Sequence, residues 1–209
     1  MVRLYAVEVQ PLAERFEALT ARLGPARRAR VLQRGPTGDG LRSLAAGLLL
    51  LEVLGLREEP PRLMHNKHGK PYLSGGTPFN LSHAENYAVL ATADAAVGVD
   101  VEYIRPIAYE RIASRFFHAE ECAYMRAAAD PAAAFFTLWT LKESYLKAEG
   151  QGFSVSPQSF CILPAGEDGA AFLDGSGYSF RRYHALEGYR LAACSGDSAF
   201  SKTIELLSF

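Results

Sequence analysis

Apolar positions along this chain follow a two-residue period in some segments and a three-to-four-residue period in others, and these segments occur in the same order twice. The first half predicts a strand at 2–9, helices at 11–23, 25–34 and 41–55, and strands at 62–65, 79–82 and 87–93. The second half predicts a strand at 97–103, helices at 108–115, 118–128 and 131–149, then strands within 158–194 and at the C-terminal end. Because helices precede antiparallel strands in both halves, the pattern favours an α+β fold with two similar lobes.

The helix expected at 131–149 has signals at both ends. Asp130 is typical of an N-cap, and Pro131 of the first helical position. Gly150 follows as the C′ residue, where glycine adopts the left-handed conformation without strain.

One face of this helix carries a mixed set of side chains. At 3.6 residues per turn, Trp139, Glu143 and Lys147 lie on one stripe, with Lys142 and Leu146 beside it. A Glu four residues before a Lys is also a common surface pair, worth about 0.2–0.5 kcal/mol. The stripe therefore has two interpretations, a solvated pair or part of a site.

The strand expected at 97–103 alternates strictly, so its valines face one side and Asp100 and Glu102 the other. Two carboxylates spaced two residues apart can converge on one hard cation, although a solvated strand face is the plain alternative. With Glu143, these residues make three carboxylates near lysines. The set suggests a Mg²⁺ site for a phosphorylated substrate, because Mg²⁺ is bound by one or two carboxylates plus phosphate oxygens.

Two further segments carry phosphate-binding chemistry. Ser82 and His83 end an apolar run and are candidate donors to phosphate, and their alternative role is a local turn. Lys70 stands before Pro71, in a turn that holds it in an extended context.

Composition and charge narrow the class of protein. The chain has 209 residues, of which 49% are hydrophobic and 22% charged, with a net charge of −1. Such values are those of a folded globular protein and argue against a general nucleic-acid binder. Basic residues nonetheless gather in the N-terminal third, as a solvated face or a phosphate site. They are Arg22, Arg27, Arg28, Arg30, Arg34 and Arg42.

The number of cysteines and the hydropathy of the chain suggest in which cellular compartment the protein is found. Three scattered cysteines give neither a disulfide framework nor a CxxC metal site, which suits a reducing cytoplasm. We expect no signal peptide and no membrane span, because no apolar run approaches the roughly 20 residues that a spanning helix needs.

Four segments occur together and in order: GKPYL at 69–73, FNLSH at 79–83, GVDVE at 98–102 and WTLKESYLK at 139–147. The set resembles the signature of the 4′-phosphopantetheinyl transferases, and the length is similar to the two-lobed, monomeric, surfactin-synthetase-activating subgroup. The resemblance covers about residues 25–160. It implies two pseudo-twofold-related lobes, 1–96 and 97–209, each a small, mainly antiparallel sheet packed with helices.

The resemblance also implies a reaction. Such enzymes transfer the 4′-phosphopantetheine arm of coenzyme A to a serine of an apo acyl or peptidyl carrier protein, releasing adenosine 3′,5′-bisphosphate. In this family the active site lies in the cleft between the lobes, with the CoA 3′-phosphate and adenine on the N-terminal side.

Carried over to this chain, the resemblance implies roles for individual residues. Asp100, Glu102 and Glu143 would hold Mg²⁺, with Mn²⁺ as an alternative. Glu143, directly or through a metal-bound water, would take the serine proton. The expected CoA contacts are Arg27, Arg30, Arg42, Lys70, Pro71, Ser82, His83, Lys142 and Lys147.

Two other functions share these features. A Mg²⁺-dependent hydrolase of CoA or of a nucleotide pyrophosphate would use the same carboxylates and basic residues, but would need no surface for a carrier protein. A non-catalytic module that binds CoA or a carrier protein would have no need of the Asp100–Glu102 pair.

The segment after the metal-binding strand is a candidate docking surface. Arg105, Arg111 and Arg115 could steer an acidic carrier protein, and Phe116 and Phe117 could anchor it or belong to the core.

Overall fold

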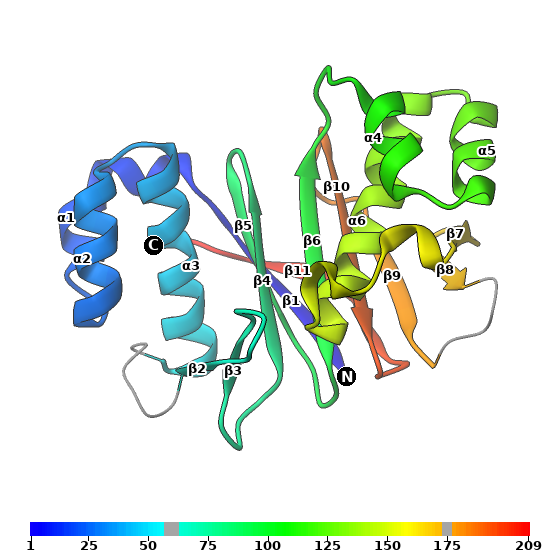
Figure 1. Cartoon of the computed structure of the whole chain (residues 1–209). Helices are drawn as coiled ribbons and strands as arrows, with labels where there is room; N and C mark the ends of the chain where they lie inside the picture. The colour runs from blue at the N-terminus through cyan, green and yellow to red at the C-terminus, as the bar shows by residue number, and fades with distance from the viewer. Residues whose placement is uncertain (57–62, 173–176) are drawn as a thin grey trace.

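The computed structural model of the chain describes residues 1–56, 63–172 and 177–209 (Figure 1). The elements of the first half are β1 (Val2–Glu8), the 3-10 helix η1 (Gln10–Arg15), α1 (Phe16–Thr20), α2 (Pro25–Arg34), α3 (Gly38–Leu54), β2 (Leu63–His65), β3 (Pro71–Leu73), β4 (Phe79–Ala84) and β5 (Tyr87–Thr92). Those of the second half are β6 (Val97–Tyr103), α4 (Tyr109–Phe116), α5 (Ala119–Ala127), α6 (Pro131–Glu149), the 3-10 helices η2 (Gly152–Ser154) and η3 (Pro157–Ser159), β7 (Ile162–Ala165), β8 (Gly169–Phe172), β9 (Ser179–Tyr183), β10 (Tyr189–Ser195) and β11 (Phe200–Leu207).

The strands of the two halves pair in the same way. In the first sheet β5 lies between β1 and β4, and in the second β10 lies between β6 and β9, with all of these pairs antiparallel. Each half also has a short hairpin before its long one, β2–β3 in the first and β7–β8 in the second. This repetition confirms the predicted α+β fold with two similar lobes.

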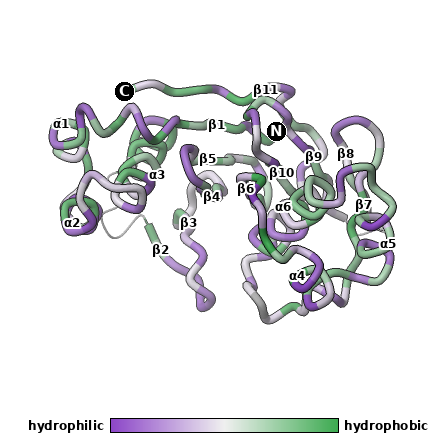
Figure 2. The backbone as a smooth tube through the Cα atoms, turned by 90° about the horizontal axis from the view of Figure 1, so that it is seen from above, coloured by the Kyte–Doolittle hydropathy of each residue, from purple (hydrophilic) through white to green (hydrophobic). Residues whose placement is uncertain are grey.

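Helices α1, α2 and α3 lie on one side of the molecule and α4, α5 and α6 on the other, with β1, β4, β5 and β6 between the two groups (Figures 1 and 2). On one side the buried leucines of α3, including Leu44 and Leu48, pack against the first sheet. On the other side α6 packs against β6 and β10. Val99 and Val101 of β6 form a shared core with Leu4 and Ala91 of the first sheet. The junction between the sheets is therefore apolar on one face of β6, which leaves its other face for α6.

The last strand crosses back to the first sheet. β11 pairs with β1 in parallel, with Leu4 opposite Ile204, and becomes an edge of the first sheet. The division expected at 96/97 grouped this strand with the second lobe. The order of strands in space thus differs from the order of segments in the chain.

The expected helix at 11–23 is divided in the structure. Residues 10–15 form the 3-10 helix η1, and α1 follows directly after it. Neither start has a side-chain cap, so the buried contacts of Leu12, Phe16 and Leu19 decide the local geometry. Strand β3 was not predicted as a strand, and of the predicted strand 62–65, residue 62 lies outside the described residues.

Membrane spans are not found among the helices of residues 1–56, 63–172 and 177–209, because none is both long and apolar enough.

Candidate active site

Two side chains of β4 join the lobes by bonding directly to the backbone of β6. Asn80 Oδ1 accepts a hydrogen bond from the Val99 amide at 2.9 Å, and Ser82 Oγ accepts one from the Val101 amide at 3.3 Å. Both side chains are buried. Because these contacts replace a strand ladder at this point, the polar face of β4 is held against the polar face of β6.

Helix α6 lies close against β6 because Gly98 has no side chain. A Cβ at Gly98 would collide with the backbone of Ser144 and Ala148. The ends of α6 are those the sequence predicted: Asp130 Oδ1 accepts a hydrogen bond from the Ala133 amide at 2.9 Å, and Gly150 is left-handed with φ 69°. The close approach brings the second half of α6 over the carboxylates of β6.

A cavity of about 550 Å³ lies where α6, β4 and β6 meet. It is lined by Arg27, Ala46, Pro71, Leu81, Ser82, His83, Asp100, Val101, Glu102, Trp139, Glu143 and Lys147. The stripe of Trp139, Glu143 and Lys147 that the helical period predicted thus faces the two carboxylates of β6. A smaller cavity of about 210 Å³ shares Pro71, Glu143 and Lys147 with the first.

At the centre of the larger cavity, Lys147 and Asp100 form an ion pair. Lys147 Nζ lies 2.6 Å from Asp100 Oδ1, and it donates to Ser82 Oγ at 3.1 Å and to the Val99 carbonyl at 3.2 Å. The Ser82 hydroxyl donates to the same carboxylate oxygen at 3.0 Å. The second oxygen, Asp100 Oδ2, is buried and has no hydrogen-bond partner among the described residues.

The other two carboxyl groups in the cavity, Glu102 and Glu143, both have raised pKa values. Burial, and next the charge of Asp100, raise the pKa of Glu102 to about 7. Burial and the same charge raise the pKa of Glu143, and Lys147 opposes the shift. Three carboxyl groups therefore share one cavity with the ammonium of Lys147, an arrangement that a divalent cation would relieve.

The donor set and the orphaned oxygen of Asp100 fit a hard cation such as Mg²⁺. As the side chains stand, however, no group of three or more His, Cys, Asp or Glu within the described ranges is arranged to hold a metal ion.

The basic residues of the first lobe lie at different distances from this centre. Arg27 is half-buried, lines the larger cavity, and donates to the Ser43 carbonyl at 3.3 Å. Arg42 donates to Asp39 at 2.6 Å and to the Glu85 carbonyl at 3.3 Å. Arg30 is exposed on α2, and the structure does not place it in either cavity.

His83 lines the larger cavity, and its surroundings favour the neutral imidazole. Burial lowers its pKa, and the nearby charges of Arg42 and Lys147 act in the same direction. A neutral imidazole can donate one hydrogen bond to a phosphate oxygen.

Lys70 lies in the smaller cavity, but its ammonium is bonded to the protein backbone. It donates to the Val97 carbonyl at 3.0 Å and to the Ala148 carbonyl at 3.1 Å, and burial lowers its pKa to about 8. Beside it, Asn66 Nδ2 donates to the Gly150 carbonyl at 2.7 Å. These contacts fix the β2–β3 turn to the end of α6. Neither Asn66 nor Asn80 was predicted as a site residue, since nothing in the local sequence marks an asparagine that bonds to distant backbone.

Lys142 was expected to contact CoA, but it lines neither of the two cavities. The residue is 2% exposed, and its ammonium bonds to Glu121 and to the Phe160 carbonyl. The physical reason is helical geometry: Lys142 lies about 100° around the helix from Glu143 and faces α5 instead of β6.

The aromatic pair of α4 belongs mainly to the core. Phe117 is buried and stacks on Phe135 with ring centroids 5.2 Å apart. Phe116 meets Trp139 edge to face at 5.7 Å. Phe117 is therefore not available as an anchor for a partner, whereas Arg105, Arg111 and Arg115 are exposed.

Comparisons with known proteins place this site in a family. A sequence model described as the 4′-phosphopantetheinyl transferase superfamily matches residues 96–194, which contain β6 and α6. The 4′-phosphopantetheinyl transferase psf-1 of Bacillus pumilus is 30% identical over 99% of this chain and 95% of its own length. The 4′-phosphopantetheinyl transferase gsp of Aneurinibacillus migulanus is 33% identical over 75% of this chain and 69% of its own.

The 4′-phosphopantetheinyl transferase Sfp of Bacillus subtilis strain 168 is 27% identical over 100% of this chain and 98% of its own length. Among solved structures, the holo-[acyl-carrier-protein] synthase of Thermotoga maritima matches with a TM-score of 0.40 and 17% identity, over 48% of this chain and 61% of that one. The identities over nearly the whole length show that this chain belongs to the 4′-phosphopantetheinyl transferase superfamily.

Proposed function

We propose that this chain transfers the 4′-phosphopantetheine moiety of CoA to a serine hydroxyl of an apo acyl or peptidyl carrier protein and releases adenosine 3′,5′-bisphosphate. One observation carries the proposal: Asp100, Glu102 and Glu143 line one cavity with Lys147 at the lobe junction of a chain that belongs to this superfamily. The relatives reported above are named as transferases, which gives no support to the alternative of a hydrolase.

The three carboxylates are proposed to hold Mg²⁺, or Mn²⁺ in its place. When bound there, the metal would neutralise the pyrophosphate of CoA and polarise the phosphoryl group under attack. Asp100 would contribute its unpartnered oxygen, and Glu102 and Glu143 would face it from β6 and α6.

The reaction forms a bond between the serine oxygen and the β-phosphorus of CoA, and breaks the bond from that phosphorus to the oxygen bridging it to the adenosine bisphosphate. Lys147 would place its ammonium on the pyrophosphate oxygens, where negative charge increases during the reaction. Glu143 would take the serine proton, directly or through water, since its carboxylate lines the cavity beside Asp100 and Lys147.

The remaining contacts to CoA would come mainly from the first lobe. His83 and Ser82 lie beside Lys147 and would donate to the phosphates, with Pro71 in the cavity wall. Arg27, Arg30 and Arg42 are proposed to bind the 3′-phosphate. Lys70 lines the adjoining cavity and would have to leave its two carbonyl partners to join them.

The oligomeric state, the compartment and the partners are proposed from the same family. We propose that the enzyme acts as a monomer in the cytoplasm, with CoA as its co-substrate and carrier proteins of fatty-acid, polyketide or non-ribosomal-peptide synthesis as its partners.

An intact-mass assay tests the proposed function. Purified chain, CoA and Mg²⁺ are incubated with an apo carrier protein, and with the same carrier whose acceptor serine is replaced by alanine. A mass gain of one phosphopantetheine on the first carrier alone is the expected result. Cleavage of CoA without any mass gain would instead indicate the hydrolase, and no reaction with binding of CoA a non-catalytic module.

A further inference from the structure

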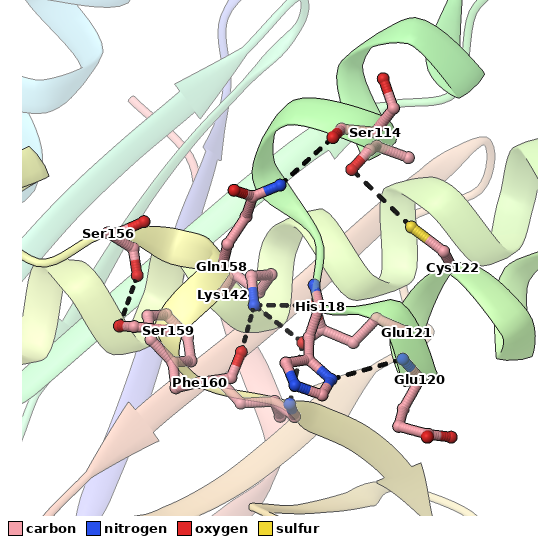
Figure 3. A network of polar contacts seen from close by, with 12 residues as sticks. Ser114, His118, Glu120, Glu121, Cys122, Lys142, Ser156, Gln158, Ser159 and Phe160 are labelled. Atoms are coloured by element: carbon pink, nitrogen blue, oxygen red, sulfur yellow. Dashed lines mark hydrogen bonds and ion pairs between the residues drawn. The ribbon is translucent and has the colours of Figure 1, made fainter.

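A fully buried ion pair joins Lys142 of α6 to Glu121 of α5 (Figure 3). Lys142 Nζ of α6 donates to both carboxylate oxygens of Glu121 on α5, at 2.8 and 2.7 Å. The two side chains are 3% and 0% exposed. Neither residue lines the larger or the smaller cavity.

Every charged atom of this pair has further partners. Glu121 accepts hydrogen bonds from the Ile162 amide at the start of β7 and from the His118 amide at the N-cap of α5, both at 2.8 Å. Lys142 also donates to the Phe160 carbonyl at 2.9 Å, and its ammonium lies 4.1 Å from the centroid of the Phe160 ring. The pair therefore ties α6 to α5 and to the segment that leads into β7.

Such a pair is poorly explained by stability alone. Burying two charges costs several kcal/mol per ion by general estimates, and an apolar pair of similar volume is often as stable. The ion pair instead fixes the orientation of α6, because the Lys142 ammonium donates to three oxygen acceptors at fixed positions. Turning or sliding α6 would break them together.

The residue after Lys142 is Glu143, the carboxylate at the centre of the proposed mechanism. On a helix it lies about 1.5 Å further along the axis and 100° around it, so fixing one side chain fixes where the next one starts. Elsewhere around α6, Lys147 is paired with one oxygen of Asp100, and the other oxygen of this carboxylate is left for a cation. The Lys142–Glu121 pair shares no residue with these contacts, so it can hold the helix when a cation binds.

We infer that Lys142 and Glu121 are positioning residues, which set the rotation and height of α6 so that Glu143 meets Asp100 and Glu102 at one cation. This inference rests on the proposed function, because it concerns the placement of the proposed metal ligands.

The test uses the whole chain and the double variant Lys142→Met/Glu121→Gln. Methionine keeps most of the lysine volume, and glutamine keeps an acceptor for the Ile162 amide, so neither charge is left buried alone. The matched control is Thr140→Val, on the same helix. Thr140 is 1% exposed, and its hydroxyl donates only within α6, to the Thr137 carbonyl at 3.0 Å.

Three quantities are measured for each protein: the melting temperature, kcat and KM for CoA, and the affinity for Mn²⁺ in the presence of CoA by electron paramagnetic resonance. We expect the double variant to melt near the wild-type temperature but to lose at least about tenfold in kcat, since small misplacements of reacting groups cost up to about 10²-fold. Its Mn²⁺ affinity should fall at least about threefold, while KM for CoA changes little and Thr140→Val resembles the wild type.

If the double variant keeps the kcat and Mn²⁺ affinity of Thr140→Val, the pair is only structural and the inference is overturned. Should the double variant fail to fold, Glu121→Asp takes its place in the same measurements, because it keeps both charges but shortens the reach to Lys142. Failure of the proposed function is seen separately, as a wild-type chain that transfers nothing to any carrier. The Mn²⁺ comparison needs no carrier and still decides the role of the pair.

Discussion

The ammonium of Lys147 on α6 lies 2.6 Å from the carboxylate of Asp100 on β6, although 47 positions separate the two residues in the chain. Its contact joins the helical stripe to the alternating strand, the two sequence patterns that suggested a site. Both residues also touch Ser82 of β4, so one serine from the first lobe reaches both halves of the proposed catalytic centre.

Asp100→Asn and Glu143→Gln should each lower transfer by at least roughly 10²-fold, the usual effect of removing one electrostatic contributor to a transition state. Both changes keep volume, so the melting temperature should stay close to that of the wild type. The measurement is the rate of mass gain on an apo carrier at saturating Mg²⁺. Glu149→Gln, on the same helix but outside both cavities, is the control and should keep its activity. Near-normal rates in either active-site variant would remove the metal-binding role.

Glu102→Gln should stabilise the metal-free protein at pH 8 and leave its stability nearly unchanged at pH 4. The folded protein raises the pKa of Glu102 from 4.5 to about 7, so it binds this proton more tightly than the unfolded chain does. That preference stabilises the fold at low pH and is lost as the pH rises from about 4.5 to about 7. Glutamine does not titrate and avoids the loss.

Thermal unfolding in the presence of a chelator measures the gap in stability between the Glu102→Gln variant and the wild type across the pH range. A gap of the same size at pH 4 and pH 8 would show that Glu102 is not held in an unfavourable charge state. Added Mg²⁺ should narrow the gap at pH 8, since it stabilises the wild type more than the variant.

Dephospho-CoA should be a poorer co-substrate than CoA. Arg27 and Arg42 lie on the first-lobe side of the site, and charge-assisted hydrogen bonds of this kind are worth about 1.5–3 kcal/mol, or roughly ten- to a hundredfold in affinity. The effect is measured as the KM for dephospho-CoA divided by the KM for CoA. Arg27→Ala and Arg42→Ala should reduce that ratio, while Arg28→Ala, exposed on the same helix as Arg27, should not. Equal KM values in the wild type would leave these arginines as a solvated basic face.

The exposed arginines of α4 should govern association with the carrier protein. Carrier proteins are typically acidic, so Arg111→Glu and Arg115→Glu are expected to raise KM for the carrier, leave KM for CoA unchanged, and flatten the salt dependence. Steady-state kinetics at low and at high salt measure all three effects. The buried position of Phe117 leaves charge as the main contribution of this segment. Wild-type constants for both variants at low salt would mean that the carrier docks elsewhere.

Most helices and strands of this fold could be predicted, because the residues that specify each one are close together in the sequence. The caps of α6 are contained in Asp130, Pro131 and Gly150, and the alternation of β6 in seven consecutive residues. The side of α6 on which Lys142 makes its contacts could not be predicted from the local sequence. Its partner Glu121 lies on another helix, and only packing decides which side of α6 is covered. Asn66, Asn80 and the parallel pairing of β11 depend likewise on contacts between distant segments.

The position of β11 has a consequence for how the chain acquires its structure during synthesis. Strand β1 leaves the ribosome before the other strands described here, yet its neighbour β11 emerges almost 200 positions later, since Val2 pairs with Phe200. The sheet of β6, β10 and β9 has all its strands by Ser195, so it can form before the first sheet receives its edge. Until then one side of β1 has open hydrogen-bonding groups, which other extended chains can pair with. The nascent protein is thus open to misassembly along β1 until β11 has been made.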